Sequence, residues 1–211
     1  YIAGHARKIN CFPENFGTPA VMAYAYDQNP MVSAVLPDDE TSAYQMTRYL
    51  IRKGHKKIAL LAGREDNLHT RRRLKGYQNA LFDAQILYNP RLVRYVDWNK
   101  PSGYQETKRL LKEDITAIFC MADTIAGGVY QYLDEQGLRA GRDVSVVGFD
   151  NQVLSEYMIP GLTTMALPLK EIGTTSAKLL FDQIEKGEVE MNREILIPCF
   201  LVERCSVKEI K

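Results

Sequence analysis

The stretch DVSVVGFDNQVLSEYMIPGLTT, from Asp143 to Thr164, decides the fold. Three valines between positions 144 and 147 form a β-branched run that Gly148 closes, which is typical of a buried strand in a parallel sheet. The strand ends at Asp150, and in an open α/β sheet ligands bind outside the carboxyl ends of the strands. An aspartate at a strand end most often caps a helix or forms a turn. Its place at the strand end nevertheless makes Asp150 a candidate ligand-binding residue.

The rest of the chain alternates between strand-like and helix-like segments. Apolar residues recur at helical spacing in the expected helices, as Ala43, Met46 and Leu50 do between the acidic cluster at 38–40 and Gly54. This alternation predicts an α/β fold with parallel, doubly wound sheets. The expected strands are Ala20–Tyr26, Val32–Leu36, Ile58–Leu61, Leu92–Val96, Thr116–Met121, Val144–Phe149, Thr163–Leu167 and Glu194–Val202. The expected helices after Gly54 are Thr70–Ala84, Ser102–Lys112, Asp123–Glu135 and a helix from Pro168 to Gly187, and Pro198 inside the last strand indicates an edge or a change of sheet.

Composition indicates an ordinary soluble globular protein. Of 211 residues, 45% are hydrophobic and 25% are charged, and 27 basic residues balance 26 acidic ones to a net charge of +1. A DNA-binding module usually carries a basic excess on one face, so this segment as a whole does not resemble one. No apolar run approaches the ~20 residues of a membrane span. The four cysteines form no CxxC pair, which favours a reducing compartment.

The chain begins Tyr1-Ile2-Ala3-Gly4, without an initiator methionine. We interpret Tyr1–Gly4 as the end of a strand whose beginning has been cut off. The lack of a signal peptide or of a DNA-binding head in this sequence therefore excludes neither.

Six short motifs follow one another along the chain, and together they identify a family. They are GHKKIALLAG (Gly54–Gly63), RLKGY (Arg73–Tyr77), DWNKPSGY (Asp97–Tyr104), TAIFCMAD (Thr116–Asp123), DVSVVGFDN (Asp143–Asn151) and PGLTT (Pro160–Thr164). In their order and spacing the chain resembles the effector-binding core of the lac repressor / purine repressor family of bacterial transcription regulators, from about Gly4 to Ser206.

The resemblance implies a two-lobed periplasmic-binding-protein-like fold with parallel αβα sheets and an effector between the lobes. Residues 1–37 and 167–197 are then a partial first lobe, and residues 38–166 and 198–211 the second lobe. The DNA-binding head and the opening strands of the first lobe are absent.

Two residues offer the chemistry of a sugar site. Arg73, near the start of a helix, carries a planar fork that can bond two adjacent hydroxyls or a carboxylate. It matches the family's effector-contacting arginine, whereas we expect its neighbours Arg71 and Arg72 to be solvated because successive helical residues diverge in direction. Trp98, the single tryptophan, offers an indole face for the C–H face of a sugar or for a base, although a partly buried loop tryptophan is the alternative. Some sugar-responsive members of the family place tryptophan here.

Four polar residues complete the candidate effector site. The resemblance aligns Asp150 with the aspartate of the family's GYD/GFD motif, which accepts hydrogen bonds from ligand hydroxyls. We expect Asp123 to cap the helix that follows it, with a ligand contact as the second interpretation. Asn67 and His69 occupy loop positions where family members often place polar effector contacts, but the loop REDNLHT departs from the purine repressor pattern, so the effector's identity does not transfer.

The sequence contains no pattern that indicates catalysis, a metal or a cofactor. Glu65, Asp66 and His69 match no strong metal-ligand spacing. A glycine-rich phosphate cradle, a GxSxG elbow and a Cys/His pair are missing as well. We therefore expect no metal site, no cofactor and no enzyme.

The sequence thus predicts the effector-sensing domain of a cytoplasmic transcription regulator. We expect it to bind a small-molecule effector, which we interpret as a sugar, and to bind operator DNA through the absent head. We also expect a homodimer formed through the second lobe, along the helix Asp123–Glu135 near Tyr132 or Gln136. We expect no membrane partner. The alternatives are a periplasmic or lipid-anchored sugar-binding protein of a transporter, which shares the fold, and an enzyme built on the same kind of sheet.

Overall fold

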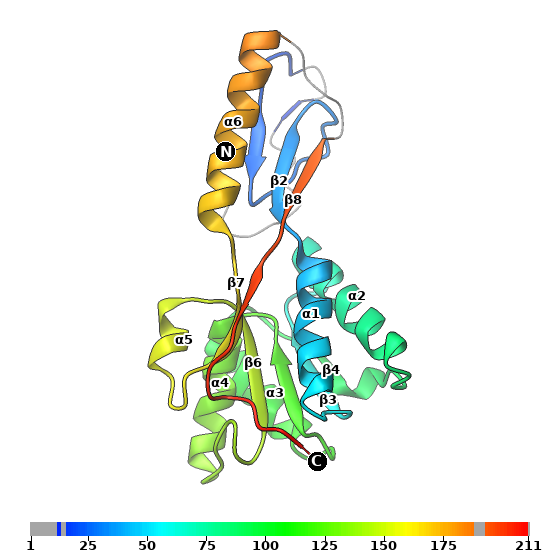
Figure 1. Cartoon of the computed structure of the whole chain (residues 1–211), viewed down its shortest axis with the longest axis vertical. Coiled ribbons are helices and arrows are strands. Elements are labelled where there is room, and N and C mark those ends of the chain that lie inside the picture. Colours follow the sequence, from blue (N-terminus) through cyan, green and yellow to red (C-terminus); the bar gives the residue numbers. More distant parts are fainter. Residues whose placement is uncertain (1–11, 14–15, 188–192, 211) are drawn as a thin grey trace. The chain divides into compact units, whose positions relative to one another are not determined.

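The computed structural model describes residues 12–13, 16–187 and 193–210, and the strand end expected at Tyr1–Gly4 lies outside them. The chain forms two units (Figure 1). Unit 1 comprises Tyr1–Asp38, Asp66–His69 and Pro168–Cys199, and unit 2 comprises Asp39–Glu65, Thr70–Leu167 and Phe200–Lys211. The chain therefore changes unit after Asp38, after Leu167 and after Cys199, close to the predicted lobe boundaries, and the short segment Asp66–His69 returns to unit 1.

The described residues of unit 1 form a three-stranded parallel sheet with one long helix packed against it. The strand order is β1-β2-β8, with β1 at Val21–Ala23, β2 at Ser33–Pro37 and β8 at Glu194–Ile197. Helix α6, Leu169–Lys186, lies beside β1 and β2 (Figure 1) and buries Ile172 and Leu179 against Val21 and Val35. The helix ends at Gly187, whose φ of 66° is the left-handed conformation that favours glycine.

Unit 2 is a six-stranded sheet in the order β4-β3-β5-β6-β7-β9. The first five strands run parallel, and β9 pairs antiparallel with β7. The strands are β3 (Ile58–Ala62), β4 (Val93–Tyr95), β5 (Ala117–Cys120), β6 (Ser145–Asp150), β7 (Thr163–Ala166) and β9 (Phe200–Val202), and a 3-10 turn, η1 (Pro90–Leu92), precedes β4. The helices are α1 (Asp39–Arg52), α2 (Leu68–Asp83, whose first two residues belong to unit 1), α3 (Lys100–Leu110), α4 (Asp123–Glu135) and α5 (Val153–Tyr157).

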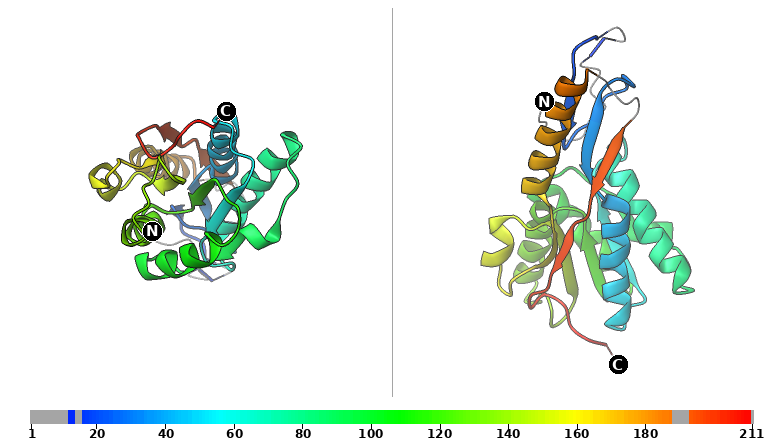
Figure 2. Two further views of the ribbon diagram at one scale, coloured as in Figure 1. Left: turned by 90° about the horizontal axis from the view of Figure 1, so that it is seen from below. Right: turned by 45° about the horizontal axis from the view of Figure 1, so that its top comes forward.

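Alternation along the strands gives the unit 2 sheet two apolar faces. On one face Ala59, Leu61, Ile118 and Val146 form a core with α3 and α4. The intervening strand residues, such as Phe119 and Phe149, are fully buried too and face the opposite way. Figures 1 and 2 show α3 and α4 together on one side of this sheet and α1 on the other. The α/β class with mostly parallel sheets is thus as predicted.

The segment expected as one final strand is two strands in two sheets. Strand β8 ends at Ile197 in the sheet of unit 1, and β9 begins at Phe200 in the sheet of unit 2. Pro198 and Cys199 separate them, because proline lacks the N–H that a continuous ladder would use. The predicted change of sheet at Pro198 is confirmed, and the predicted single strand is wrong.

Helix caps explain where the observed helix ends differ from the predicted ones. Helix α4 begins and ends at the predicted residues, Asp123 and Glu135. Helix α3 begins two residues earlier than predicted, because the side chain of Asn99 caps it by accepting the N–H of Ser102 at 2.9 Å. Pro168 lies at the cap of α6 and is not its first helical residue, contrary to expectation.

The segment from 203 to 210 fastens unit 2 from outside the sheet. Ser206 Oγ donates to the carbonyl of Val146 and accepts the N–H of Thr163 at 2.8 Å, while the N–H of Val146 bonds to the Ser206 carbonyl at 2.9 Å. Buried His55 hydrogen-bonds the Thr116 side chain and the Lys208 carbonyl, which holds this segment against unit 2. Among the described residues, no helix combines the length and the apolar character that a membrane crossing needs.

Candidate ligand site

The candidate residues of unit 2 lie where its parallel strands end. Trp98 follows β4, Asp123 follows β5 and Asp150 closes β6. The carboxyl ends of parallel strands lie along one edge of the sheet, and in this architecture ligands bind at that edge. Arg73 reaches the same edge from α2, since its guanidinium donates to the carbonyl of Met121 just beyond β5.

Arg73 is the centre of a buried ionic group, here called the Arg73 cluster (Arg73, Asp39, Asp150 and Phe149). Its Nε donates to Asp39 Oδ1 at 2.7 Å, and its Nη1 lies 3.9 Å from Asp150 Oδ1. The guanidinium carbon stands 3.6 Å from the centroid of the Phe149 ring, a cation–π geometry. Arg73 as a whole is only 1% exposed, so the protein rather than solvent balances its charge.

Asp150 is held in an unusual backbone conformation at the end of β6. Its φ is 112° and that of Asn151 is 55°, a region that residues with a side chain seldom adopt and that is often found at functional sites. Burial raises the pKa of Asp150 to about 7, with the carboxylates of Asp123 and Asp39 acting in the same direction and Arg73 against it. Gln152 Nε2 donates to its Oδ2 at 3.2 Å.

Asp123 does not cap α4, so the preferred interpretation of this residue is wrong. No side chain caps the N-terminus of α4, and the Asp123 carboxylate instead accepts the N–H of Gln152 and the hydroxyl of Thr164, each at 2.7 Å. Burial raises its pKa to about 6 against those two hydrogen bonds. The carboxylate also occupies the space beside Gly148, where an added Cβ would lie 2.2 Å from Asp123 Oδ1. Asp123 therefore fastens the loop that carries Asp150.

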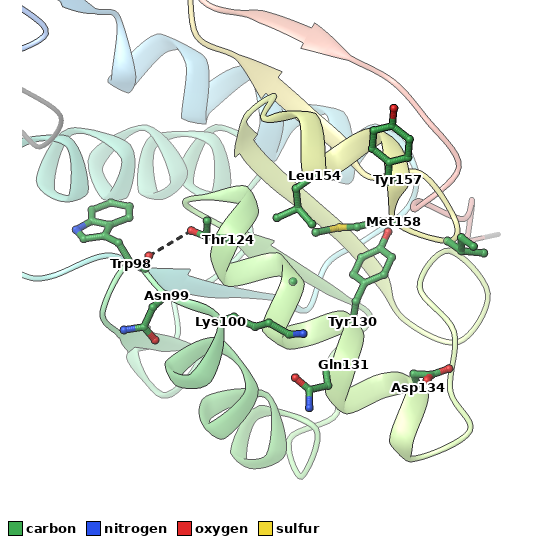
Figure 3. Close-up of a pocket in the computed structure, with 12 residues that line it drawn as sticks. Trp98, Asn99, Lys100, Thr124, Tyr130, Gln131, Asp134, Leu154, Tyr157 and Met158 are labelled. Carbon is green, nitrogen blue, oxygen red and sulfur yellow. Dashed lines mark hydrogen bonds between the residues drawn. The ribbon is translucent and has the colours of Figure 1, made fainter.

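Trp98 is half-buried on the core of unit 2, with its indole over the backbone of Gly63. A Cβ at Gly63 would lie 1.9 Å from the indole, so only glycine at the end of β3 leaves room for the ring. Thr124 Oγ1 donates to the Trp98 carbonyl at 3.3 Å, which ties this loop to α4 (Figure 3). One side of the ring is thus packed against the protein, as expected for a partly buried loop tryptophan.

Asn67 and His69 belong to unit 1, apart from the residues above. The side chain of Asn67 accepts the N–H of His69 at 2.9 Å, and the imidazole of His69 stacks on the Tyr24 ring with centroids 4.9 Å apart. Both residues are nearly buried. The structure therefore brings Arg73, Asp150 and Asp123 together, and it places Asn67 and His69 together in the other unit.

Sequence reasoning missed Asp39 and the role of Phe149. Asp39 lies within a run of three acidic residues, each of which is able to serve a helix N-terminus, and nothing in the run distinguishes the one that pairs with Arg73. Arg71 is exposed as expected, but Arg72 is half-buried. No group of three or more potential metal ligands occurs within the described part of the chain.

A second feature of unit 2 is an apolar groove on α3, α4 and α5. It encloses about 720 Å³, and Figure 3 shows Trp98 at one end and Tyr130, Leu154 and Met158 toward the other. Four large apolar residues on and after α5 are exposed, here called the α5 surface: Val153 (72%), Leu154 (41%), Tyr157 (78%) and Ile159 (91%). Tyr132, which with Gln136 marks the predicted dimer contact on α4, packs edge-on against Tyr104, with ring centroids 5.2 Å apart.

The chain matches known proteins over most of its length. The model of the family described as "Periplasmic binding protein-like domain" matches residues 47–207. The HTH-type transcriptional repressor CytR of Escherichia coli K12 is 34% identical over 194 residues, which are 91% of this chain and 57% of that protein. The chain therefore spans about half the length of the curated relatives it matches.

Solved structures show the same fold. A LacI family transcriptional regulator from Enterococcus faecium, with bound ribose, is 30% identical with a TM-score of 0.81, and the match covers 94% of this chain and 83% of that one. A putative transcriptional regulator LacI from Bacillus cereus subsp. cytotoxis is 31% identical with a TM-score of 0.85, over all of this chain and 76% of that one. From the family match, these identities and this coverage, the chain belongs to the periplasmic binding protein-like domain of the LacI family of transcriptional regulators.

Proposed function

We propose that this chain is the effector-sensing domain of a transcription regulator and binds a sugar through Arg73, Asp150 and Trp98. The observation that carries the proposal is the Arg73 cluster at the carboxyl edge of the unit 2 sheet. An arginine donor beside a carboxylate acceptor matches a hydroxyl, which both donates and accepts hydrogen bonds. The exposed face of a half-buried indole offers a platform for the apolar face of a sugar ring.

The relatives favour a regulator over a transport protein. CytR is named as a transcriptional repressor, and the Enterococcus faecium regulator was solved with ribose. In our proposal Asn67 and His69 of unit 1 also contribute to effector binding. Binding would favour one conformation of the protein and so alter the affinity of a DNA-binding head for operator DNA in the cytoplasm.

We further propose that the chain forms a homodimer through the α5 surface and the groove beside it. The four large apolar residues grouped around α5 expose an unusually large apolar area to water. A second copy would cover them across a two-fold axis, with α4 at the same interface. This shifts the expected contact from Tyr132 to Leu154, Tyr157 and Ile159.

The test of effector binding uses the fluorescence of Trp98 in the full-length protein, titrated with neutral monosaccharides. We expect one class of sugar to give a saturable change. Arg73→Lys keeps the charge beside Asp39 but loses the planar fork, so it should weaken binding at least tenfold, and Asp150→Ala should do the same. Arg71→Lys is the matched control, because Arg71 is exposed on the same helix, and it should bind as the wild type does. Equal affinities in all four proteins would exclude this site.

A further inference from the structure

We propose that Asp39 sets the charge class of the effector: by pairing with Arg73 it makes the site accept uncharged polyhydroxyl ligands and reject phosphorylated or carboxylated ones. The inference rests on the proposed function, because it requires that the effector reach Arg73 and Asp150. It gives Asp39 the part of a specificity-determining residue.

The geometry of the pair makes Arg73 a poor anion receptor. Arg73 Nε and Asp39 Oδ1 are 2.7 Å apart, and the two side chains are 2% and 0% exposed. A guanidinium recognises phosphate or carboxylate by offering two parallel N–H groups along one edge. The two edges of a guanidinium that offer such a pair are Nε with Nη2 and Nη1 with Nη2. Here Nε already donates to a carboxylate and Nη1 donates to the Met121 carbonyl, so one atom of each edge is committed within the protein.

Asp39 lies where a helix favours a negative charge. Asp39 is the first residue of α1, a helix of 14 residues, where the N-terminal end of the helix dipole favours a negative charge. The guanidinium beside it acts in the same direction. Arg73 and Asp39 therefore form a buried ion pair, and the negative charge of Asp39 cancels the positive charge with which Arg73 would attract an anion.

The carboxylates near Arg73 also oppose an anion. Asp150 lies 3.9 Å from Arg73 Nη1, and both Asp39 and Asp123 act on Asp150 as like charges. A phosphate placed beside Arg73 would therefore face carboxylates as well as the single guanidinium, and like charges at such distances repel one another strongly where water is excluded. A sugar hydroxyl avoids this cost, since it accepts from Arg73 and donates to a carboxylate.

The experiment compares neutral aldoses with their phosphate monoesters by calorimetric titration of the full-length protein. We expect the wild type to bind its best neutral aldose at least tenfold more tightly than the corresponding ester. Asp39→Asn keeps the size of the side chain and an oxygen acceptor for Arg73 Nε but removes the charge. It should shift the ratio of the two dissociation constants toward the ester by tenfold or more.

Glu40→Gln is the matched control, because Glu40 is the next residue of the same turn and pairs with Lys75 at the surface. It should leave the ratio unchanged. A purely structural role for Asp39 would weaken both ligands equally in Asp39→Asn and would overturn the inference. If the wild type alone binds the ester more tightly than the neutral aldose, the inference about Asp39 is overturned, while the proposed effector sensing stands. If the wild type binds neither series, the proposed function fails and this inference fails with it.

Discussion

Two neighbouring regions of unit 2 distribute polarity in opposite ways. The Arg73 cluster buries a guanidinium and carboxylates, whereas the α5 surface, which begins three residues after Asp150, exposes large apolar side chains. Ordinary folding favours the reverse in both places, because buried charge costs free energy and exposed apolar area gains none. Each region is therefore retained for something other than the stability of this chain alone. We propose that the first region binds a ligand with hydroxyl groups and that the second binds another protein surface.

The largest effect on stability should come from removing the positive charge of the cluster. Arg73→Met leaves Asp39 buried without its partner and should lower the free energy of unfolding by about 3–5 kcal/mol. Adding Asp39→Asn to that variant removes the uncompensated charge and should restore at least half of the loss. Urea unfolding of the wild type, the single variant and the double variant measures both. A loss below 1 kcal/mol would mean that the pair is not buried in solution.

A smaller effect, dependent on pH, should come from Asp150. Its pKa in the folded chain, about 7, is above the ordinary 3.8, so the folded state holds this proton more tightly than the unfolded state. The stability that Asp150 contributes is therefore fully present below about pH 4 and is lost as the pH rises to about 7.

Asp150→Asn does not titrate, so its free energy of unfolding relative to the wild type should rise by about 2–4 kcal/mol between pH 4 and pH 8. Urea unfolding across this pH range measures the difference. Asp143→Asn is the control, because the hydrogen bond from Arg142 lowers the pKa of the half-buried Asp143 carboxyl, which therefore stays ionised over this range. A difference between Asp150→Asn and the wild type that stays constant with pH would show that Asp150 titrates normally.

The third largest effect on the free energy of unfolding tests how Asp123 fastens the loop that carries Asp150. Gly148→Ala would bring a methyl group to 2.2 Å from Asp123 Oδ1, so the carboxylate has to move, and we expect a loss of about 1–3 kcal/mol in the free energy of unfolding. Gly173→Ala is the control, because no heavy atom lies within 4 Å of its added Cβ inside α6. It should stabilise the chain by about 0.5–1 kcal/mol. Equal thermal midpoints for the two variants would contradict the packing at Gly148.

The smallest effect on stability should come from the α5 surface, where association should change instead. Ile159→Asp and Tyr157→Asp replace exposed side chains, so each should alter the free energy of unfolding of the monomer by less than about 0.5 kcal/mol. Both should convert a dimer to a monomer in sedimentation equilibrium. Leu87→Asp, at a site that is 92% exposed outside this surface, should leave the dimer intact. Dimers of unchanged strength in Ile159→Asp would place the interface elsewhere.

Local signals in the sequence were sufficient for much of the fold. The helix Asp123–Glu135 was predicted with its observed ends, because a strand end precedes it and Gly137 follows it closely. An edge or a change of sheet was predicted at Pro198, because proline cannot donate to the ladder of a central strand, and the change of sheet is what the fold has. Position along the strands also identified Asp150 as lying at the ligand-binding edge of the sheet.

The chemistry of the site depended on partners that are distant in the sequence. Asp123 has the position of a helix cap in the sequence. Only the fold shows that Thr164 and Gln152 donate hydrogen bonds to its carboxylate. Asp39 resembles its acidic neighbours until α2 brings Arg73 to it. Gly148 carried the one signal that could have been used, since a glycine inside a strand often marks the close approach of another group.

The way in which unit 2 is assembled from separate stretches constrains how the protein is made. Its edge strand β9 and the bonds of Ser206 come from residues that the ribosome adds some forty positions after β7. Until these residues leave the exit tunnel, β7 has an open edge and the N–H of Val146 has no Ser206 carbonyl to bond. Unit 2 therefore completes its sheet only after α6 and β8 have been made, and a ribosome that stalls within α6 holds a nascent chain in which one edge of β7 is unpaired.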